Sequence, residues 1–299
     1  MKLLVTGITG HSGKRFLNNL ETNNFNGEVN VVVRESSKTD ILDNSSLKIV
    51  KHIGDLDDKK FLNKVTQNVD TVIQIAHIKY SLNILEAAVQ NNVDWFIGVH
   101  TTGIYSNFKV ASEEYIAIEK ELEKYRDDIN ITLLRPTMIY GSSMDQNMFK
   151  LVKFIDKSPV FPLFGLGKNL MQPVHAKDLG KAYYNVLMTP EITKNKSYIL
   201  SGKYPITYKE LVKTVAAELN SHVKIINIPI KLSYYSALVG NRLIPKFPIN
   251  EEQVLRMKED KNFPHLSAKR DFGYNPVSFK EGIKEEVEEY LSMKRGKSE

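Results

Sequence analysis

The chain has 299 residues and no cysteine, and its 41 Lys and Arg against 35 Asp and Glu give a net charge of +6. Without cysteine there is no disulfide framework, thiolate nucleophile, iron–sulfur cluster or Cys–zinc site. With 42% hydrophobic and 25% charged residues, the chain is long and apolar enough for a sizeable core, which excludes disordered and collagen-like classes.

The apolar run at the N-terminus stops at Val5, short of the roughly 7–15 apolar residues of a signal peptide. No later stretch approaches the roughly 18 apolar residues of a membrane span. We therefore expect no membrane association and a cytoplasmic location. The basic residues form no stripe interleaved with aromatic residues, so nucleic acid is not expected as a partner.

The first half of the chain alternates between two hydrophobic periods. Short apolar runs, many of them β-branched, suit strands buried on both faces, and they occur at 3–5, 29–33, 47–50, 69–76, 93–99 and 129–134. Helical spacing of apolar residues separates them, as at Phe16, Leu17 and Leu20. Strands that alternate with helices predict a doubly wound, parallel α/β fold.

The second half is less regular. Residues 159–167 and 245–248, which contain Gly and Pro, are expected to be loops. Thr207 with Glu210 and Ser278 with Glu281 are capping boxes that predict the starts of two amphipathic helices.

A glycine-rich loop follows the first predicted strand, and a helix is expected from Lys14. Gly7 allows a tight turn, Gly10 lets a pyrophosphate approach bare backbone, and Gly13 lets the helix pack closely on the strand. The phosphates would sit at the positive end of the helix. This pattern predicts dinucleotide binding; the alternative is an ordinary glycine-rich turn.

The end of the second predicted strand bears on the choice of cofactor. Arg34 stands where a cation would favour a ribose 2′-phosphate, so NADP(H) is preferred, while the adjacent Glu35 keeps NAD(H) open. Asp55, after the third strand, would accept a hydrogen bond from the adenine amino group, or would serve only as a turn or cap residue.

Several motifs, in order and spacing, resemble the extended and atypical branch of the short-chain dehydrogenase/reductase superfamily, which includes nucleotide-sugar epimerases and dehydratases. They are TGITGHSG at 6–13, GDL at 54–56, NILEAAVQNNV at 83–93, TTGIY at 101–105, LLRPTMIYG at 133–141, QPVHAKDLGKAY at 172–183 and FGYNPVSFKEGIKEEVEEYL at 272–291. The resemblance implies a Rossmann domain over 1–160, with later segments at about 170–200 returning to it. A smaller, non-contiguous α/β substrate domain would lie mainly in 161–299.

The resemblance also implies the site residues. The cofactor would be bound by Gly7, Thr9, Gly10, His11, Ser12, Gly13, Arg34, Asp55, Leu56, Ala76 and His77. Catalysis in this superfamily uses a Ser or Thr, a Tyr, and a Lys four residues after the Tyr. Thr101 and Thr102 match the first position, and Tyr115 is the candidate tyrosine.

The lysine position departs from the pattern. Four residues after Tyr115 stands Glu119, and a carboxylate cannot lower the pKa of a phenol. In a second register Glu119 matches a glutamate that follows the lysine in relatives, which leaves Tyr115 in the lysine position and Ala111 in the tyrosine position. Packing in an apolar helix stripe accounts for Tyr115 equally well.

Other departures concern the substrate. Met171 stands where relatives that bind a sugar-nucleotide pyrophosphate have an arginine, and residues 76–80 lead almost directly into a helix where such relatives have a longer loop. By family position His77 and His175 lie near the cleft, where His175 either contacts substrate or fixes the loop before Asp178. The seven histidines show no paired metal-ligand spacing, so no metal is expected.

The sequence therefore predicts an NADP(H)-dependent oxidoreductase or epimerase/dehydratase-like enzyme for a small carbonyl, alcohol or sugar-type substrate. The alternative is a catalytically inactive NADP(H)-binding regulatory or scaffold protein of the same fold. A homodimer is the default expectation for this superfamily.

Overall fold

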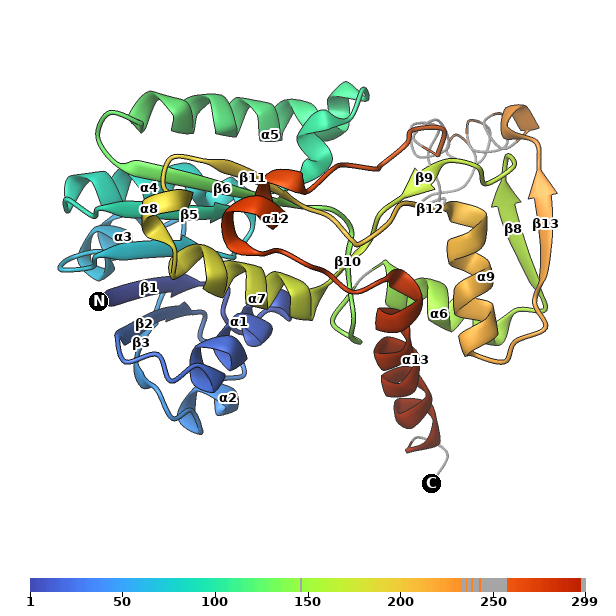
Figure 1. Cartoon of the computed structure of the whole chain (residues 1–299), viewed down its shortest axis with the longest axis horizontal. Helices are drawn as coiled ribbons and strands as arrows, with labels where there is room; N and C mark the ends of the chain where they lie inside the picture. Colours follow the sequence, from blue (N-terminus) through green and yellow to red (C-terminus); the bar gives the residue numbers. More distant parts are fainter. Residues whose placement is uncertain (146, 233–234, 236–237, 239–241, 243–256, 297–299) are drawn as a thin grey trace.

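A seven-stranded parallel sheet, in the order β11-β6-β5-β4-β1-β2-β3, forms the centre of the computed structural model (Figure 1). The structure describes residues 1–299 apart from 146, 233–234, 236–237, 239–241, 243–256 and 297–299. The strands are β1 (Lys2–Thr6), β2 (Glu28–Val33), β3 (Lys48–Ile53), β4 (Thr71–Gln74), β5 (Trp95–Val99), β6 (Asn130–Pro136) and β11 (Ser197–Leu200). The predicted doubly wound α/β fold is confirmed.

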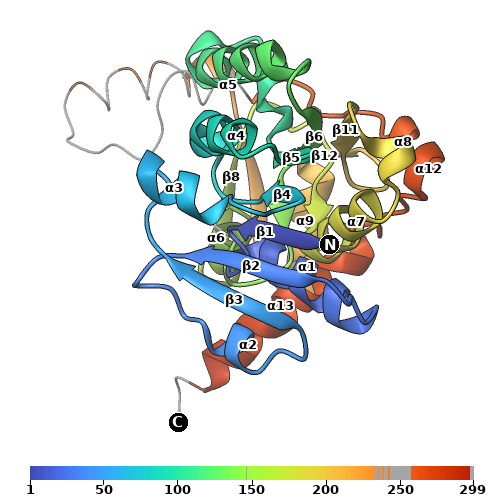
Figure 2. The same cartoon turned by 90° about the vertical axis from the view of Figure 1, so that its left-hand side faces the viewer.

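Helices cover both faces of this sheet, and each face has its own hydrophobic cluster (Figures 1 and 2). On one face α1 (His11–Thr22), α7 (Ala176–Leu187) and α12 (Leu266–Phe272) contribute apolar side chains. On the other lie α3 (Lys59–Val65), α4 (Ser81–Gln90) and α5 (Lys109–Leu122). Short helical segments complete this half: α2 (Asp40–Asp43), η1 (Ile78–Tyr80), η2 (Thr102–Tyr105), η3 (Glu123–Tyr125) and α8 (Pro190–Thr193).

The six apolar runs of the first half correspond to β1 to β6, with small differences at their ends. The helix after the glycine loop begins at His11 rather than Lys14, because Gly10 is its N-cap and Gly13 lies inside its first turn. The seventh strand, β11, was not predicted. It lies in the stretch at about 170–200 that the resemblance returns to this half, and it pairs in parallel with β6, more than sixty positions earlier in the chain.

A smaller unit stands beside the sheet (Figure 1). It contains α6 (Met148–Lys157), β8 (Val160–Phe164), α9 (Tyr208–Glu218), β13 (Lys224–Ile228) and α13 (Phe279–Arg295), packed around a third hydrophobic cluster. Two-residue strands link it to the larger half: β7 (Ile139–Tyr140), β9 (Leu170–Met171), β10 (Val174–His175) and β12 (Ile206–Thr207). The expected capping boxes of α9 and α13 are both present.

The expectation of a loop over 159–167 is wrong, since β8 occupies residues 160–164. Its Pro162 sits opposite Ile226 in a two-stranded parallel sheet with β13, where a residue without an N–H is tolerated at an edge. The loop expected at 245–248 lies outside the described residues. No helix in the described part of the chain combines the length and apolarity needed to cross a membrane.

Helices α1 and α7 approach each other at a glycine. A Cβ added to Gly180 would lie 2.4 Å from the carbonyl carbon of Arg15, so the two backbones are nearly in contact there. This close packing holds α7, from the second half of the chain, against the helix that follows the glycine loop.

We expect Gly180→Ala to lower the free energy of unfolding by about 1–3 kcal/mol, because the added methyl group meets backbone rather than a movable side chain. The matched control is Gly296→Ala, where a Cβ would lie no closer than 3.7 Å to its nearest neighbour. Urea denaturation followed by fluorescence of Trp95, which is 2% exposed, measures both changes. Equal stability of the two variants would contradict the packing argument.

Candidate cofactor and substrate site

A cavity of about 400 Å³ opens at the carboxyl edge of the sheet, over the ends of β1, β2, β3 and β4. The sheet order reverses its direction of growth between β1 and β4, the switch point where open α/β sheets bind ligands. Its lining residues are Gly7, Thr9, Gly10, Val32, Val33, Arg34, Ser37, Gly54, Asp55, Leu56, Ala76, His77, Lys79 and Tyr80.

The glycine loop forms one wall of this cavity. Gly7 has φ +77°, and a Cβ there would lie 2.5 Å from the backbone nitrogen of Ala76, so the turn requires a residue without a side chain. A Cβ on Gly13 would lie 2.2 Å from the carbonyl oxygen of Gly7, which permits helix and strand to pack as the spacing predicts. No side chain caps α1, so its first amide groups and positive dipole end suit a pyrophosphate.

The end of β2 supplies a cation to the cavity. Arg34 lines it, and its backbone N–H donates to the hydroxyl oxygen of Ser37, a second lining residue. Glu35 is exposed and is not among the lining residues. Three lining residues were not predicted from the sequence: Ser37, which follows Arg34 by only three positions, Lys79 and Tyr80.

Most of the predicted cofactor residues meet in this cavity. Asp55 lines it and also accepts a hydrogen bond from the Asp57 N–H at 3.0 Å. It therefore acts as a turn residue and at the same time faces the cavity. His77 lines it while accepting the Lys79 N–H. Ser12 and Gly13 do not line the cavity, and His11 lines a separate cavity of about 630 Å³ beside residues 142–144.

A further cavity of about 610 Å³ lies at the ends of β5 and β6, the next strands along the same edge. Thr101 and Thr102 line it together with Thr137 and Met138. Thr101 also caps η2 by accepting the Gly103 N–H, and the buried Thr102 hydroxyl donates to the Pro136 carbonyl. Residues 257 and 259–261 and Phe263 also line it, and we call the stretch 257–263, which leads to α12, the crossing segment.

Tyr115 lies close to this site without lining either cavity. A methyl group on Gly103 would stand 3.4 Å from the Tyr115 ring, so the ring rests against the η2 turn that carries the two threonines. Among the described residues no hydrogen bond joins the Tyr115 hydroxyl to another side chain. One helical turn later, Glu119 points elsewhere.

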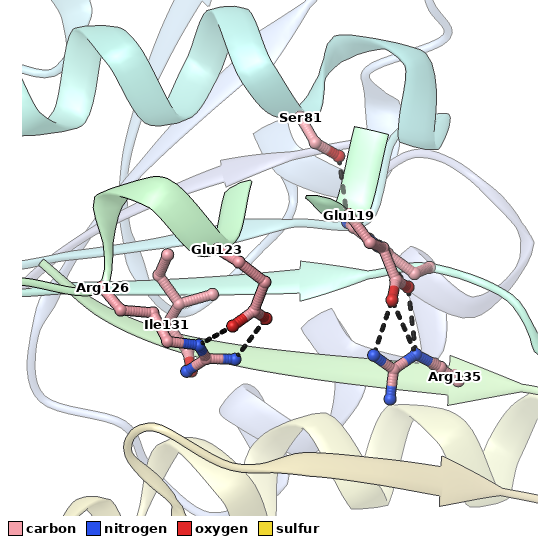
Figure 3. Close-up of polar contacts among 7 residues, drawn as sticks. Ser81, Glu119, Glu123, Arg126, Ile131 and Arg135 are labelled. Carbon is pink, nitrogen blue, oxygen red and sulfur yellow. Dashed lines mark hydrogen bonds and ion pairs between the residues drawn. The ribbon is translucent and has the colours of Figure 1, made fainter. Parts of the chain in front are cut away.

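Glu119 is the centre of a buried polar network (Figure 3). Its carboxylate accepts from Arg135 Nε at 3.0 Å and Nη2 at 2.6 Å, and from His100 Nδ1 at 3.0 Å. Since a carboxylate only accepts, His100 Nδ1 carries the proton and Nε2 accepts from the Ser81 hydroxyl at 3.1 Å. The network joins α4, α5, β5 and β6 directly behind Thr101.

Burial and hydrogen bonding act in opposite directions on this network. Burial disfavours a charged Glu119, but hydrogen bonds from His100 and Arg135 outweigh it, so the pKa of Glu119 lies below its ordinary value. Burial lowers the pKa of His100, which keeps the ring neutral at pH 7. The network is therefore an ion pair with a neutral imidazole beside it.

His175 has a structural role. It is 2% exposed, caps α7 by accepting the Lys177 N–H, and packs edge-to-face on Tyr140 at 5.1 Å between ring centroids. Burial lowers its pKa to about 4. It lines neither the cofactor cavity nor the threonine cavity, as expected for a residue that fixes the loop before Asp178. Within the described ranges no group of His, Asp and Glu residues could hold a metal ion.

We expect Glu119→Gln to lower the free energy of unfolding by about 3–5 kcal/mol at pH 7, because it leaves the buried Arg135 without a counterion. Glu123→Gln, at the exposed pair with Arg126 drawn beside it in Figure 3, is the matched control and should cost less than about 1 kcal/mol.

The same comparison has a pH dependence. Because the pKa of Glu119 is lowered by folding, its stabilisation is present at neutral pH and is lost as the pH falls through the folded-state pKa. The difference between wild type and Glu119→Gln should therefore shrink in acid, as measured by denaturant midpoints at several pH values. A difference that stays constant down to pH 3 contradicts this account.

Comparison with known proteins agrees with this architecture. At 19% identity and a TM-score of 0.74, the UDP-glucose 4-epimerase of Thermotoga maritima, solved with UDP-glucose, covers 98% of this chain and 99% of its own. The UDP-glucuronic acid 4-epimerase of Bacillus cereus, solved with UDP-glucuronic acid and NAD, has 18% identity and a TM-score of 0.76 over 98% and 100%. A nucleoside-diphosphate-sugar epimerase of Staphylococcus aureus has 17% identity and a TM-score of 0.75 over 96% and 100%.

At these identities the solved structures establish the fold alone, and the family rests on a separate match. The model of the NAD dependent epimerase/dehydratase family matches residues 3–200, about two thirds of the sequence, including the glycine loop and both threonines. The chain belongs to the NAD dependent epimerase/dehydratase family.

Proposed function

We propose that this protein is an NADP(H)-dependent enzyme of the oxidoreductase or epimerase/dehydratase type that acts on a small carbonyl, alcohol or sugar-type substrate. The observation that carries the proposal is the pair of cavities at neighbouring strand ends. One has the glycine loop and the N-cap glycine of an uncapped helix, and the other is lined by three threonines, Thr101, Thr102 and Thr137. A homodimer and a cytoplasmic location stay predictions from the sequence.

NADP(H) is the cofactor that the cavity favours. The guanidinium of Arg34 can bind a phosphate through two parallel hydrogen bonds, and Ser37, whose hydroxyl accepts the Arg34 backbone N–H, lines the same cavity. Glu35, the carboxylate that would favour a free ribose 2′-hydroxyl, is turned to solvent. The Bacillus cereus neighbour was solved with NAD, so this preference is proposed for the present chain alone.

The bound cofactor would supply or accept a hydride, and the protein would orient the substrate. In this proposal Thr101 and Thr102 hold the substrate oxygen. The hydroxyl of Tyr115, on the adjoining helix α5, exchanges a proton with that oxygen. Glu119 takes no part in proton transfer, because its carboxylate is committed to Arg135 and His100. The position four residues after Tyr115, where the superfamily pattern has its lysine, holds this glutamate.

The missing lysine favours a second candidate, a regulatory or scaffold protein that binds NADP(H) without catalysing a reaction. The Glu119 carboxylate stabilises the fold and faces away from both cavities, so the helix carries a structural ion pair where the superfamily pattern has catalytic chemistry. The two candidates agree on cofactor binding and differ on turnover.

We expect the protein to bind NADPH more tightly than NADH, and Arg34→Ala to raise the NADPH dissociation constant about 10- to 100-fold with little effect on NADH. Lys38→Ala removes an exposed cation that does not line the cavity and is the matched control. Calorimetric titration measures both. Tighter binding of NADH by the wild-type protein would overturn the preference.

Turnover tests the catalytic roles. With NADPH and a panel of aldehydes, ketones and nucleotide sugars, Tyr115→Phe and Thr102→Val should each reduce kcat about 10²- to 10⁴-fold while NADPH affinity stays within twofold. Tyr125→Phe removes a hydroxyl from the neighbouring segment η3, which lines neither cavity, and should leave kcat unchanged. Cofactor binding without turnover of any compound in the panel would favour the non-catalytic candidate.

A further inference from the structure

The threonine cavity has a chemically uneven lining. Threonines line it at the strand ends, and the lining also includes apolar and aromatic side chains from several segments, namely Met138, Met171, Met257, Tyr105 and Phe263. The rings of Tyr105 and Phe263 pack at 5.6 Å between centroids. This arrangement suits a compact ligand with a polar end at the threonines and an apolar body.

The charged groups that line the cavity come from the crossing segment. Among the described lining residues they are two carboxylates, Glu259 and Asp260, and one ammonium, Lys261. Glu259 accepts the Asn107 N–H at 2.7 Å and the Ser106 hydroxyl at 3.0 Å, and both of these donors are neutral. Within the described ranges it forms no ion pair, so its negative charge is not compensated by a bonded cation.

Hydrogen bonds to residues 170 and 172 also hold the crossing segment, which restrains the Glu259 carboxylate. The Leu170 N–H donates to the Asp260 carboxylate at 2.7 Å, and the Lys261 N–H donates to the Leu170 carbonyl at 2.8 Å. Two residues later the Phe263 N–H donates to the Gln172 side-chain oxygen at 2.8 Å. Glu259 is thus fixed between the turn before α5 and the β9 strand.

A carboxylate held in a cavity wall repels an anionic ligand that enters the cavity, and added salt screens this repulsion. A nucleoside diphosphate brings at least two negative charges and needs cationic partners for them. The carboxylate of Glu259 is negative and repels these phosphates. An uncharged carbonyl compound meets no such repulsion.

We propose that Glu259 determines the substrate class of the threonine cavity: it rejects nucleoside-diphosphate substrates and leaves the cavity to small uncharged carbonyl or alcohol compounds with an apolar body. The inference rests on the proposed function and deepens it. Glu259 acts as a specificity residue and takes no part in hydride or proton transfer.

The experiment measures binding of uridine diphosphate to the NADPH-saturated protein by calorimetry at low and high salt. Glu259→Gln, which removes the charge and keeps one acceptor oxygen, should bind uridine diphosphate about 5- to 10-fold more tightly than wild type at 50 mM salt. The ratio should fall toward one at 500 mM salt, where the repulsion is screened.

Two controls separate charge from structure. Ser106→Ala removes hydrogen bonds to the same carboxylate and keeps its charge, so it should not tighten uridine diphosphate binding. Glu86→Gln makes the same change in net charge at an exposed pair with Lys59, remote from the cavity, and should have no effect. NADPH affinity should be the same in all variants, since none of these residues lines the cofactor cavity.

Three outcomes overturn the inference. The first is equal uridine diphosphate affinity in wild type and Glu259→Gln, including no measurable binding by either. The others are tightening by Ser106→Ala equal to that by Glu259→Gln, and wild-type turnover of UDP-glucose above that of uncharged aldehydes. Failure of the proposed function is distinguishable, because it shows as loss of NADPH binding, or of all turnover, in the wild-type protein before any variant is compared.

Discussion

The geometry of the site depends on one buried carboxylate. Glu119, on α5, binds Arg135 on β6 and His100 at the end of β5, and through His100 it reaches Ser81 at the start of α4. A lone buried charge is unfavourable, so these elements must meet in one arrangement for every partner to be satisfied. That arrangement fixes the backbone on which Thr101 and Thr102 stand. Helix α5, which carries Tyr115, is thereby oriented by Glu119, whose charge is already paired with Arg135.

The cofactor half could be predicted from the sequence because its determinants are local. Gly7 and Gly13 need only their near neighbours to define the turn, and Arg34 follows directly from the end of a recognisable strand. The parts that were missed depend on distant partners. Strand β8 forms by pairing with β13, and Glu259 becomes part of the site through Ser106 and Asn107, more than 150 positions away. No local pattern encodes such pairings, so they appear only once the chain is folded.

The two halves of the site differ in what they constrain. The cofactor cavity is bordered by a glycine turn and by strand ends, and a methyl group on Gly7 would collide with backbone there. The threonine cavity is shaped by side chains from five separate stretches, including the crossing segment. Substitutions can therefore alter the second cavity while the first keeps its form, which is how one dinucleotide fold serves many substrates.

The unpredicted strand β11 and helix α7 have a consequence for how the protein forms. β11 pairs with β6, and α7 packs on α1, yet both follow the segment 148–164 that belongs to the smaller unit. During synthesis the first 160 residues would expose an unpaired strand edge and an uncovered apolar face until the chain had grown past residue 200. We therefore expect ribosome-bound intermediates of that length to be prone to aggregation until the later segments are added.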